Sequence, residues 1–189
     1  MHEERKILLT TSRRPTSRIR SFCHDLVGCL SNIVRVNRGK LNIDGITEKA
    51  LEIGADRIVI VDRWKGGLGK IQFFLVKETN LTPVPPSIYI KSIKLRREFA
   101  TKTKSIQSFV VTTSSERSPR NKKVAESLAH FFNIPMLSVD QDVSRYSASM
   151  HVSTNTSSLT MITFVLLPEF VEIGPRISVA KVTHFDKVK

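Results

Sequence analysis

The chain has 189 residues, of which 40% are hydrophobic, and it carries 30 Lys and Arg against 17 Asp and Glu, a formal net charge of +13. This hydrophobic content can build a core and excludes a disordered basic tail, and the length suits one domain or two small halves. The sequence has neither a signal-peptide pattern nor an apolar run of the roughly 18–20 residues that cross a bilayer. We therefore expect a soluble, cytoplasmic protein that does not bind membranes.

The first half alternates apolar strands with amphipathic helices. Its predicted elements are a strand at 6–11, a helix from Pro15 and Thr16 to about residue 30, a strand at 33–36, a helix that starts at Asp44 or Thr47 and is closed by Gly54, and strands at 56–64, 70–77 and 87–95. Gly66, Gly67 and Gly69 are expected to form the turn before 70–77, and Thr82–Pro86 a proline-rich loop.

The second half repeats this order with one helix fewer. Its predicted elements are a strand at 108–113, a helix with Ser118 as N-cap and Pro119 in its first turn that runs to about Phe132, a strand at 136–139, a hairpin of 150–156 and 159–167, and a strand at 174–182. This alternation predicts an α/β fold with some antiparallel strand pairs. We expect a single domain over 1–189 whose half-repeats, 1–95 and 107–189, are joined by a basic linker at 96–106.

An internal repeat links the two halves. Residues 10–12 (TTS) recur as residues 112–114, a shift of 102 residues. Without a gap, the same shift places Arg18 on Arg120, Arg20 on Lys122 and Leu26 on Leu128. Both copies predict an apolar strand, a basic loop rich in hydroxyls and the start of a helix. This arrangement brings backbone N–H groups and cations together at a helix N-terminus, where anions bind.

The positive charge is concentrated where the repeat lies. Residues 1–40 hold nine Lys and Arg against three Asp and Glu, and residues 91–123 hold ten against two. A polyanion, above all RNA, is the partner that such a distribution favours. The alternative is that the hydroxyl side chains only cap helices and the cations only cover surface. The candidate RNA-binding residues are Thr10, Thr11, Ser12, Arg13, Arg14, Arg18, Arg20, Thr112, Thr113, Ser114, Arg117, Arg120, Lys122, Lys123 and Arg176.

Nothing in the sequence predicts catalysis, a cofactor or a metal site. The GGLGK stretch at 66–70 is not a nucleotide-binding P-loop, because Trp64 stands where the first glycine is needed and Ile71 follows Lys70. The five histidines lack the spacing of metal ligands. We interpret Asp140 and Asp142 as part of a polar loop after a strand. Aromatic residues of the strands, Trp64, Phe73, Phe74 and Tyr89, could stack on bases but are more typical of a core.

The two cysteines, Cys23 and Cys29, are six residues apart on one predicted helix. This spacing suits neither a disulfide nor a closed zinc site. We interpret both as small core residues of a protein in a reducing compartment.

Four segments together resemble the Brix-domain family of ribosome-biogenesis proteins. They are TTSRRPTSRIRSF at 10–22, IVRVNRGK at 33–40, DRIVIVDRW at 56–64 and EIGPRISVAKV at 172–182. The first segment looks most like the small-subunit processome branch and its short archaeal relatives. The glycine-proline-arginine signature at Gly174–Arg176 is the second anchor of the resemblance.

The resemblance implies a fold of two similar halves, each akin to the anticodon-binding domain of class II aminoacyl-tRNA synthetases. It also implies a non-enzymatic protein that binds precursor rRNA and assists its folding or processing, in company with other assembly proteins. Residues 10–14, Arg18 and 172–176 match the family's motifs, whereas the cations of the second half are assigned from the repeat alone. Ser115 and Glu116 replace Arg13 and Arg14 there, so the second loop is less basic.

Three alternatives remain open at this stage. A stand-alone tRNA-binding module would share the implied fold. An assembly scaffold would use its basic face to bind acidic proteins. A nucleotide-dependent enzyme is argued against by the failed P-loop. For Arg176 the sequence leaves two roles, a phosphate contact or an ion pair with Glu172 that braces the sheet.

Overall fold

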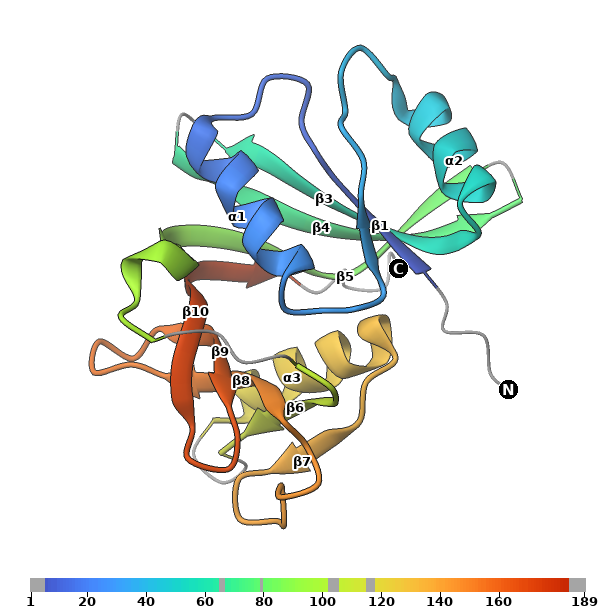
Figure 1. Ribbon diagram of the computed structural model, residues 1–189. Helices are drawn as coiled ribbons and strands as arrows, with labels where there is room; N and C mark the ends of the chain where they lie inside the picture. Colours follow the sequence, from blue (N-terminus) through green and yellow to red (C-terminus); the bar gives the residue numbers. More distant parts are fainter. Residues whose placement is uncertain (1–5, 65–66, 79, 102–105, 115–117, 184–189) are drawn as a thin grey trace, which may run out of the picture. The chain divides into compact units, whose positions relative to one another are not determined.

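The computed structural model of the chain describes residues 6–64, 67–78, 80–101, 106–114 and 118–183 (Figure 1). Its internal contacts divide the chain into two units, one of Met1–Tyr89 with Thr183–Lys189 and one of Ile90–Val182, here called unit 1 and unit 2. The predicted linker at 96–106 begins with a short 3-10 helix, η1 (Arg96–Glu98), in unit 2, while its residues 102–105 lie outside the described residues.

Unit 1 is a twisted sheet with helices packed against it. Its elements are β1 (Lys6–Thr11), α1 (Ser17–Val27), β2 (Ile33–Arg35), α2 (Ile43–Glu52), β3 (Ala55–Trp64), β4 (Gly67–Lys77) and β5 (Asn80–Lys94), whose last residues belong to unit 2. The strand order is β2-β1-β3-β4-β5, with β1 parallel to β2 and β3 and the later pairs antiparallel. Leu8, Ile58 and Ile60 pack with Ile46 and Ala50 of α2, which therefore covers one face of the sheet.

Unit 2 has the same strand order and the same pairing senses. Its elements are β6 (Phe109–Thr113), α3 (Pro119–Phe132), β7 (Met136–Ser138), β8 (Ala148–Thr154), β9 (Thr160–Leu166) and β10 (Val171–Thr183), which ends in unit 1. The order is β7-β6-β8-β9-β10, with β6 parallel to β7 and β8 and the later pairs antiparallel. Residues 139–147, between β7 and β8, form no helix, as the sequence predicts.

The predicted helix starts are confirmed where a side chain caps the helix. Thr16 accepts a hydrogen bond from the backbone of Ile19 (3.2 Å), and Ser118 accepts one from Asn121 (3.3 Å), with Pro119 at the first helical position. The predicted starts of α2, Asp44 or Thr47, are wrong by one and four residues. Asn42 is its N-cap, accepting from the Gly45 backbone at 2.8 Å, and the helix begins at Ile43.

One predicted loop and part of a predicted turn are strand instead. Thr82–Pro86 lies within β5, and Gly67 and Gly69 lie within β4, while Gly66 of the predicted turn lies outside the described residues. Ile71 pairs with Ile88 whereas Phe73 pairs with Val84, so β5 has two more residues than β4 between these pairs. This bulge includes Pro85 and Pro86. Bulges and strand edges tolerate proline because they require no N–H donor to the ladder, and sequence patterns cannot foresee them.

Both cysteines are buried, as predicted, and neither forms a disulfide. Burial raises the pKa of the Cys23 thiol to about 12. No helix within the described ranges is long and apolar enough to cross a membrane. In the same ranges no group of three or more His, Cys, Asp and Glu residues is placed to hold a metal ion.

Candidate nucleic-acid interface

The four threonines of the repeat are buried and hold the ends of the parallel strands. Thr10 donates to the carbonyl of Val36 (2.8 Å), and Thr113 donates to that of Val152 (2.9 Å). Thr11 donates to the Ser12 carbonyl, and Thr112 shares hydrogen bonds with Ser149 (2.6 Å) and His151 (3.0 Å). Their hydroxyls are thus engaged in hydrogen bonds within each unit, where they support the loops that follow β1 and β6. Contacts of these threonines with RNA stay a prediction.

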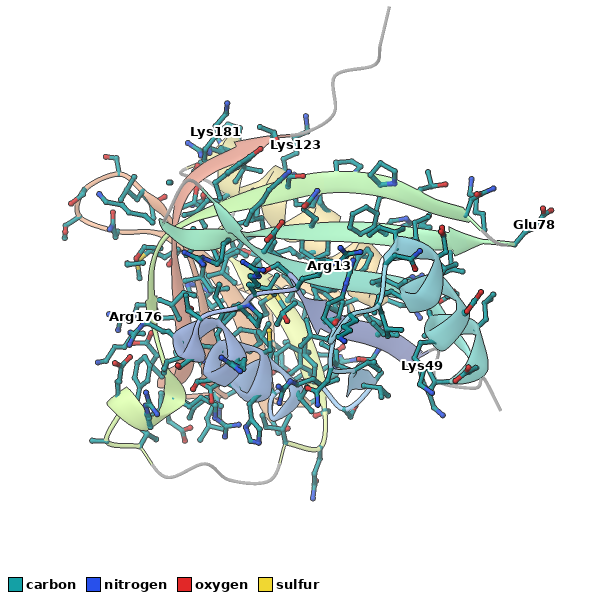
Figure 2. The ribbon with its side chains drawn as sticks, turned by 90° about the horizontal axis from the view of Figure 1, so that it is seen from above. Arg13, Lys49, Glu78, Lys123, Arg176 and Lys181 are labelled. Carbon is teal, nitrogen blue, oxygen red and sulfur yellow. The ribbon has the colours of Figure 1, made fainter. Side chains whose placement is uncertain are left out.

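The loop after β1 presents cations at the N-terminus of α1. Arg13, labelled in Figure 2, and Arg14 are exposed, and so is Arg20, which donates to the carbonyl of Pro15 (3.3 Å). Arg18 is half-buried. The first turn of α1 contains no acidic residue, so nothing offsets the positive end of the helix dipole. An anion at this helix start would meet a positive field.

A pocket of about 610 Å³ lies beside this loop within unit 1. It is lined by Ser12, Arg13, Arg38, Asn42, Ile43, Asp44, Ile60, Asp62, Gln72 and Phe74.

Arg38 is only 8% exposed, and its Nε donates to the Leu41 carbonyl at 2.9 Å. Burial and the nearby Arg13 charge lower the pKa of Arg38, while Asp62 raises it. The Ser12 hydroxyl is buried and has no hydrogen-bond partner among the described residues. Two guanidinium groups and an unpaired hydroxyl can thus receive an anion, with Asp44 and Asp62 limiting how much charge the pocket accepts.

The equivalent helix start in unit 2 is also basic. Arg120, Lys122 and Lys123 are exposed on α3, whose first turn has no acidic residue (Figure 2 labels Lys123). Between them, Asn121 is buried and bonds to Thr154 (2.7 Å) and Thr160 (2.8 Å), which fixes the start of α3 on the sheet. Ser114 is half-buried at the end of β6, and Arg117 lies outside the described residues.

Arg176 takes the bracing role. Its Nε donates to the Glu172 carboxylate at 2.6 Å, and its Nη2 donates to the other carboxylate oxygen. These hydrogen bonds raise the pKa of Arg176. The guanidinium carbon lies 5.5 Å from the centre of the Phe99 ring, and Lys94 Nζ lies 4.2 Å from the same ring. The Gly174–Arg176 signature thus packs around Phe99, so its arginine is already engaged inside unit 2.

Comparison with known proteins places this geometry in a family. No family model matches the chain. A relative from Methanopyrus kandleri, named a probable Brix domain-containing ribosomal biogenesis protein, is 33% identical over 135 residues, 69% of this chain and 68% of the relative. The chain belongs to the Brix-domain family of ribosomal biogenesis proteins. A second relative with the same name, from Thermococcus kodakarensis, is 36% identical over 112 residues, and the match spans only 53% of its length.

Solved structures show the same Brix fold. The crystal structure of a probable ribosomal biogenesis protein from Aeropyrum pernix superposes with a TM-score of 0.75 at 24% identity, covering 94% of this chain and 96% of that chain. Mil, an archaeal Imp4-like protein, gives a TM-score of 0.62 at 18% identity, covering 94% and 99%. At these identities the likeness concerns the fold alone.

Arg38 lines the pocket beside the loop after β1 but is not among the candidate residues predicted from the sequence. It belongs to the IVRVNRGK segment at 33–40, which is one of the four family motifs, so a signal was present. Only the folded chain brings Arg38 close enough to Arg13 and Asp62 for their charges to act on it.

His151 makes the stability of the Brix-domain chain depend on pH. Burial lowers the pKa of His151 below its ordinary value of 6.5. Below about pH 6.5, His151 therefore binds a proton more readily in the unfolded chain than in the folded chain. The free energy of unfolding falls as the pH drops toward 5. Denaturant unfolding at pH 7.5 and 5.5 should show a smaller drop for His151→Gln than for the wild type. The matched control is a substitution of His24, an exposed histidine of α1. An identical drop in the free energy of unfolding for His151→Gln and the wild type would contradict the prediction.

Proposed function

We propose that this Brix-domain chain binds precursor rRNA in the cytoplasm and assists its folding or processing during assembly of the small ribosomal subunit. The observation that carries the proposal is the same in both units. A buried strand ends in a loop that enters a helix whose first turn lacks acidic residues, and exposed cations gather there on a chain of net charge +13. No catalytic role forms part of the proposal.

The cations at and beside the two helix starts are assigned to phosphate contacts. These are Arg13, Arg14, Arg18, Arg20 and Arg38 in unit 1, and Arg117, Arg120, Lys122 and Lys123 in unit 2. Arginine suits this role because its planar fork gives bidentate, charge-assisted hydrogen bonds to phosphate oxygens. Phosphate contacts position an RNA without reading its sequence, so selectivity has to come from other groups or from an assembly protein.

The proposal includes an internal duplication. The two units share strand order, pairing senses and the 102-residue repeat, which supports an origin from one ancestral half akin to a tRNA anticodon-binding domain. The small-subunit assignment is supported by the likeness of the 10–22 segment to that branch of the family.

Competition between two RNAs tests the proposal. Purified chain should bind fragments of the small-subunit rRNA precursor more tightly than tRNA at the same salt concentration, measured by fluorescence anisotropy. Tighter binding of tRNA would favour a tRNA-binding module instead. Failure to bind either RNA would contradict the proposal and favour a scaffold whose basic surface meets acidic proteins.

A further inference from the structure

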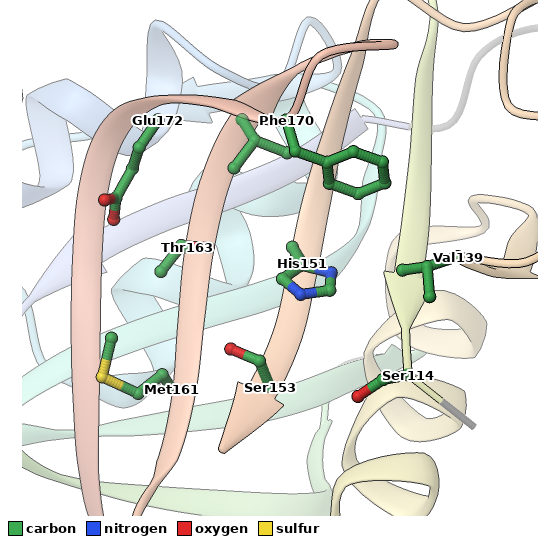
Figure 3. A pocket seen from close by; sticks show the side chains of 9 residues that line it. Ser114, Val139, His151, Ser153, Met161, Thr163, Phe170 and Glu172 are labelled. Carbon is green, nitrogen blue, oxygen red and sulfur yellow. The ribbon is translucent and has the colours of Figure 1, made fainter. Parts of the chain in front are cut away.

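Unit 2 has a second pocket, of about 490 Å³, on the face of its sheet that α3 does not cover (Figure 3). Successive residues of a strand face opposite sides, and Asn121 of α3 bonds to Thr154 and Thr160 on the covered side. His151, Ser153 and Thr163 lie on the other side. The pocket is lined by Ser114, Val139, His151, Ser153, Met161, Thr163, Val165, Phe170 and Glu172.

The two pockets occupy equivalent positions but differ in chemistry. Thr10 pairs with Ile60 in unit 1, and Thr112 pairs with His151 in unit 2, which fixes the equivalence. By register, the unit 1 residues Ser12, Ile60, Asp62, Gln72 and Phe74 correspond to Ser114, His151, Ser153, Thr163 and Val165. Two arginines and two aspartates line the first pocket, whereas Glu172 is the only charged residue lining the second within the described chain.

The lining suits a flat, uncharged group that forms hydrogen bonds. The one carboxylate, Glu172, is engaged by Arg176, so the pocket supplies neither a free cation nor a free anion. Figure 3 shows the rings of Phe170 and His151 and the hydroxyls of Ser114 and Ser153 among the side chains that line the pocket. The Phe170 and His151 rings meet edge to face with their centres 5.6 Å apart. Thr112 bonds His151 Nδ1 at 3.0 Å, which fixes the imidazole and leaves Nε2 for other contacts.

The pocket lies a short distance along the chain from the basic start of α3. Ser114 lines it, and Ser118, the N-cap of α3, lies four residues further along the chain, a span of at most about 14 Å. Arg120, Lys122 and Lys123 follow on α3. A nucleic-acid strand whose phosphates meet these cations therefore has a base within reach of the pocket.

We infer that this pocket holds one unpaired nucleobase of the bound RNA, stacked on Phe170 and hydrogen-bonded by His151 and the neighbouring hydroxyls. The inference rests on the proposed function, since it names the group of the RNA that unit 2 reads. Proteins recognise single-stranded RNA in this way, with an aromatic ring under the base and polar groups at its edge. Both units would contact the phosphates, and unit 2 would add a contact to the base.

A pair of oligonucleotides tests the inference. We expect a 12-residue oligouridine to bind the wild-type chain about 5–100-fold more tightly than an abasic strand of the same length, because one stacked base contributes that factor. Ser153→Trp, which fills the pocket, and Phe170→Ala, which removes the stacking ring, should each shrink this ratio toward one without changing the salt dependence of binding. Ser157→Trp, at an exposed turn of the same unit, is the matched control and should keep the ratio.

Photocrosslinking locates the base directly. A single 4-thiouridine in the oligouridine should crosslink to a peptide containing His151 or Phe170, identified by mass spectrometry, and Ser153→Trp should abolish that crosslink. Binding of both strands with equal affinity, or crosslinks confined to other peptides, would overturn the inference and leave RNA binding intact. Failure to bind either strand would overturn the proposed function itself.

Discussion

Replacing Gly174 by alanine is expected to lower the free energy of unfolding by about 2–4 kcal/mol. Gly174 has φ +66°, a left-handed conformation that costs an L-residue about 1 kcal/mol. A Cβ at this position would come within 2.4 Å of a ring carbon of Phe99, and relieving that overlap adds about 1–3 kcal/mol. The same ring lies beside Arg176 and Lys94, so the displacement would disturb the whole signature.

Gly54→Ala is the matched control for Gly174→Ala. Gly54 has nearly the same φ (+71°), but its Cβ would meet nothing within 4 Å, so only the backbone cost of about 1 kcal/mol remains. Phe99→Ala removes the ring that the Gly174→Ala methyl would overlap. The double variant should therefore be less stable than Phe99→Ala alone only by the backbone cost of about 1 kcal/mol. Denaturant unfolding followed by circular dichroism measures all four variants. Equal losses for the two glycine substitutions would show that the contact with Phe99 does not constrain the signature.

Replacing Arg13 and Arg14 together by alanine is expected to weaken RNA binding about 10–100-fold at low salt. Both side chains are exposed, and Arg13 lines the pocket of Arg38, so folding should survive their loss. Two lost phosphate contacts would also flatten the salt dependence by about 1.4 units for a single-stranded RNA. Titration by fluorescence anisotropy at several salt concentrations measures both effects.

The control for this double substitution removes the same charge elsewhere. Lys77→Ala with Lys91→Ala takes two exposed positive charges from β4 and β5, outside the two helix starts. It should reduce affinity only through the smaller net charge of the chain. If both double variants lost affinity and salt dependence equally, binding would follow overall charge, and the loop after β1 would have no special role.

Local signals were readable from the sequence, and contacts between distant segments were not. The helix opening at Thr16 and the N-cap Ser118 follow from residues within three positions of them, and both predictions are confirmed. In the sequence, in contrast, nothing near Thr10 identifies a partner for its hydroxyl. The partner is the carbonyl of Val36, which is 26 residues away along the chain and is brought close by β2. The bulge at Pro85 likewise depends on pairing with β4, which a strand pattern does not contain.

The same distinction between local signals and distant contacts applies to the candidate site. Exposed cations on the helix starts were predictable because charge and helix caps are local, and Arg13, Arg20 and Lys122 are exposed as the repeat suggests. The pocket of His151 was not, because it forms only when β8 pairs with β6 and Phe170 closes one side. A histidine within an apolar strand carries no signal of such a partner.

Crosslinking of the chain to RNA in its native cell, followed by sequencing of the bound fragments, tests the central claim most directly. The account predicts that the fragments concentrate on the small-subunit rRNA precursor and that Arg13→Ala with Arg14→Ala depletes them. Fragments dominated by tRNA, or the absence of any enriched RNA from a folded and expressed chain, would contradict it.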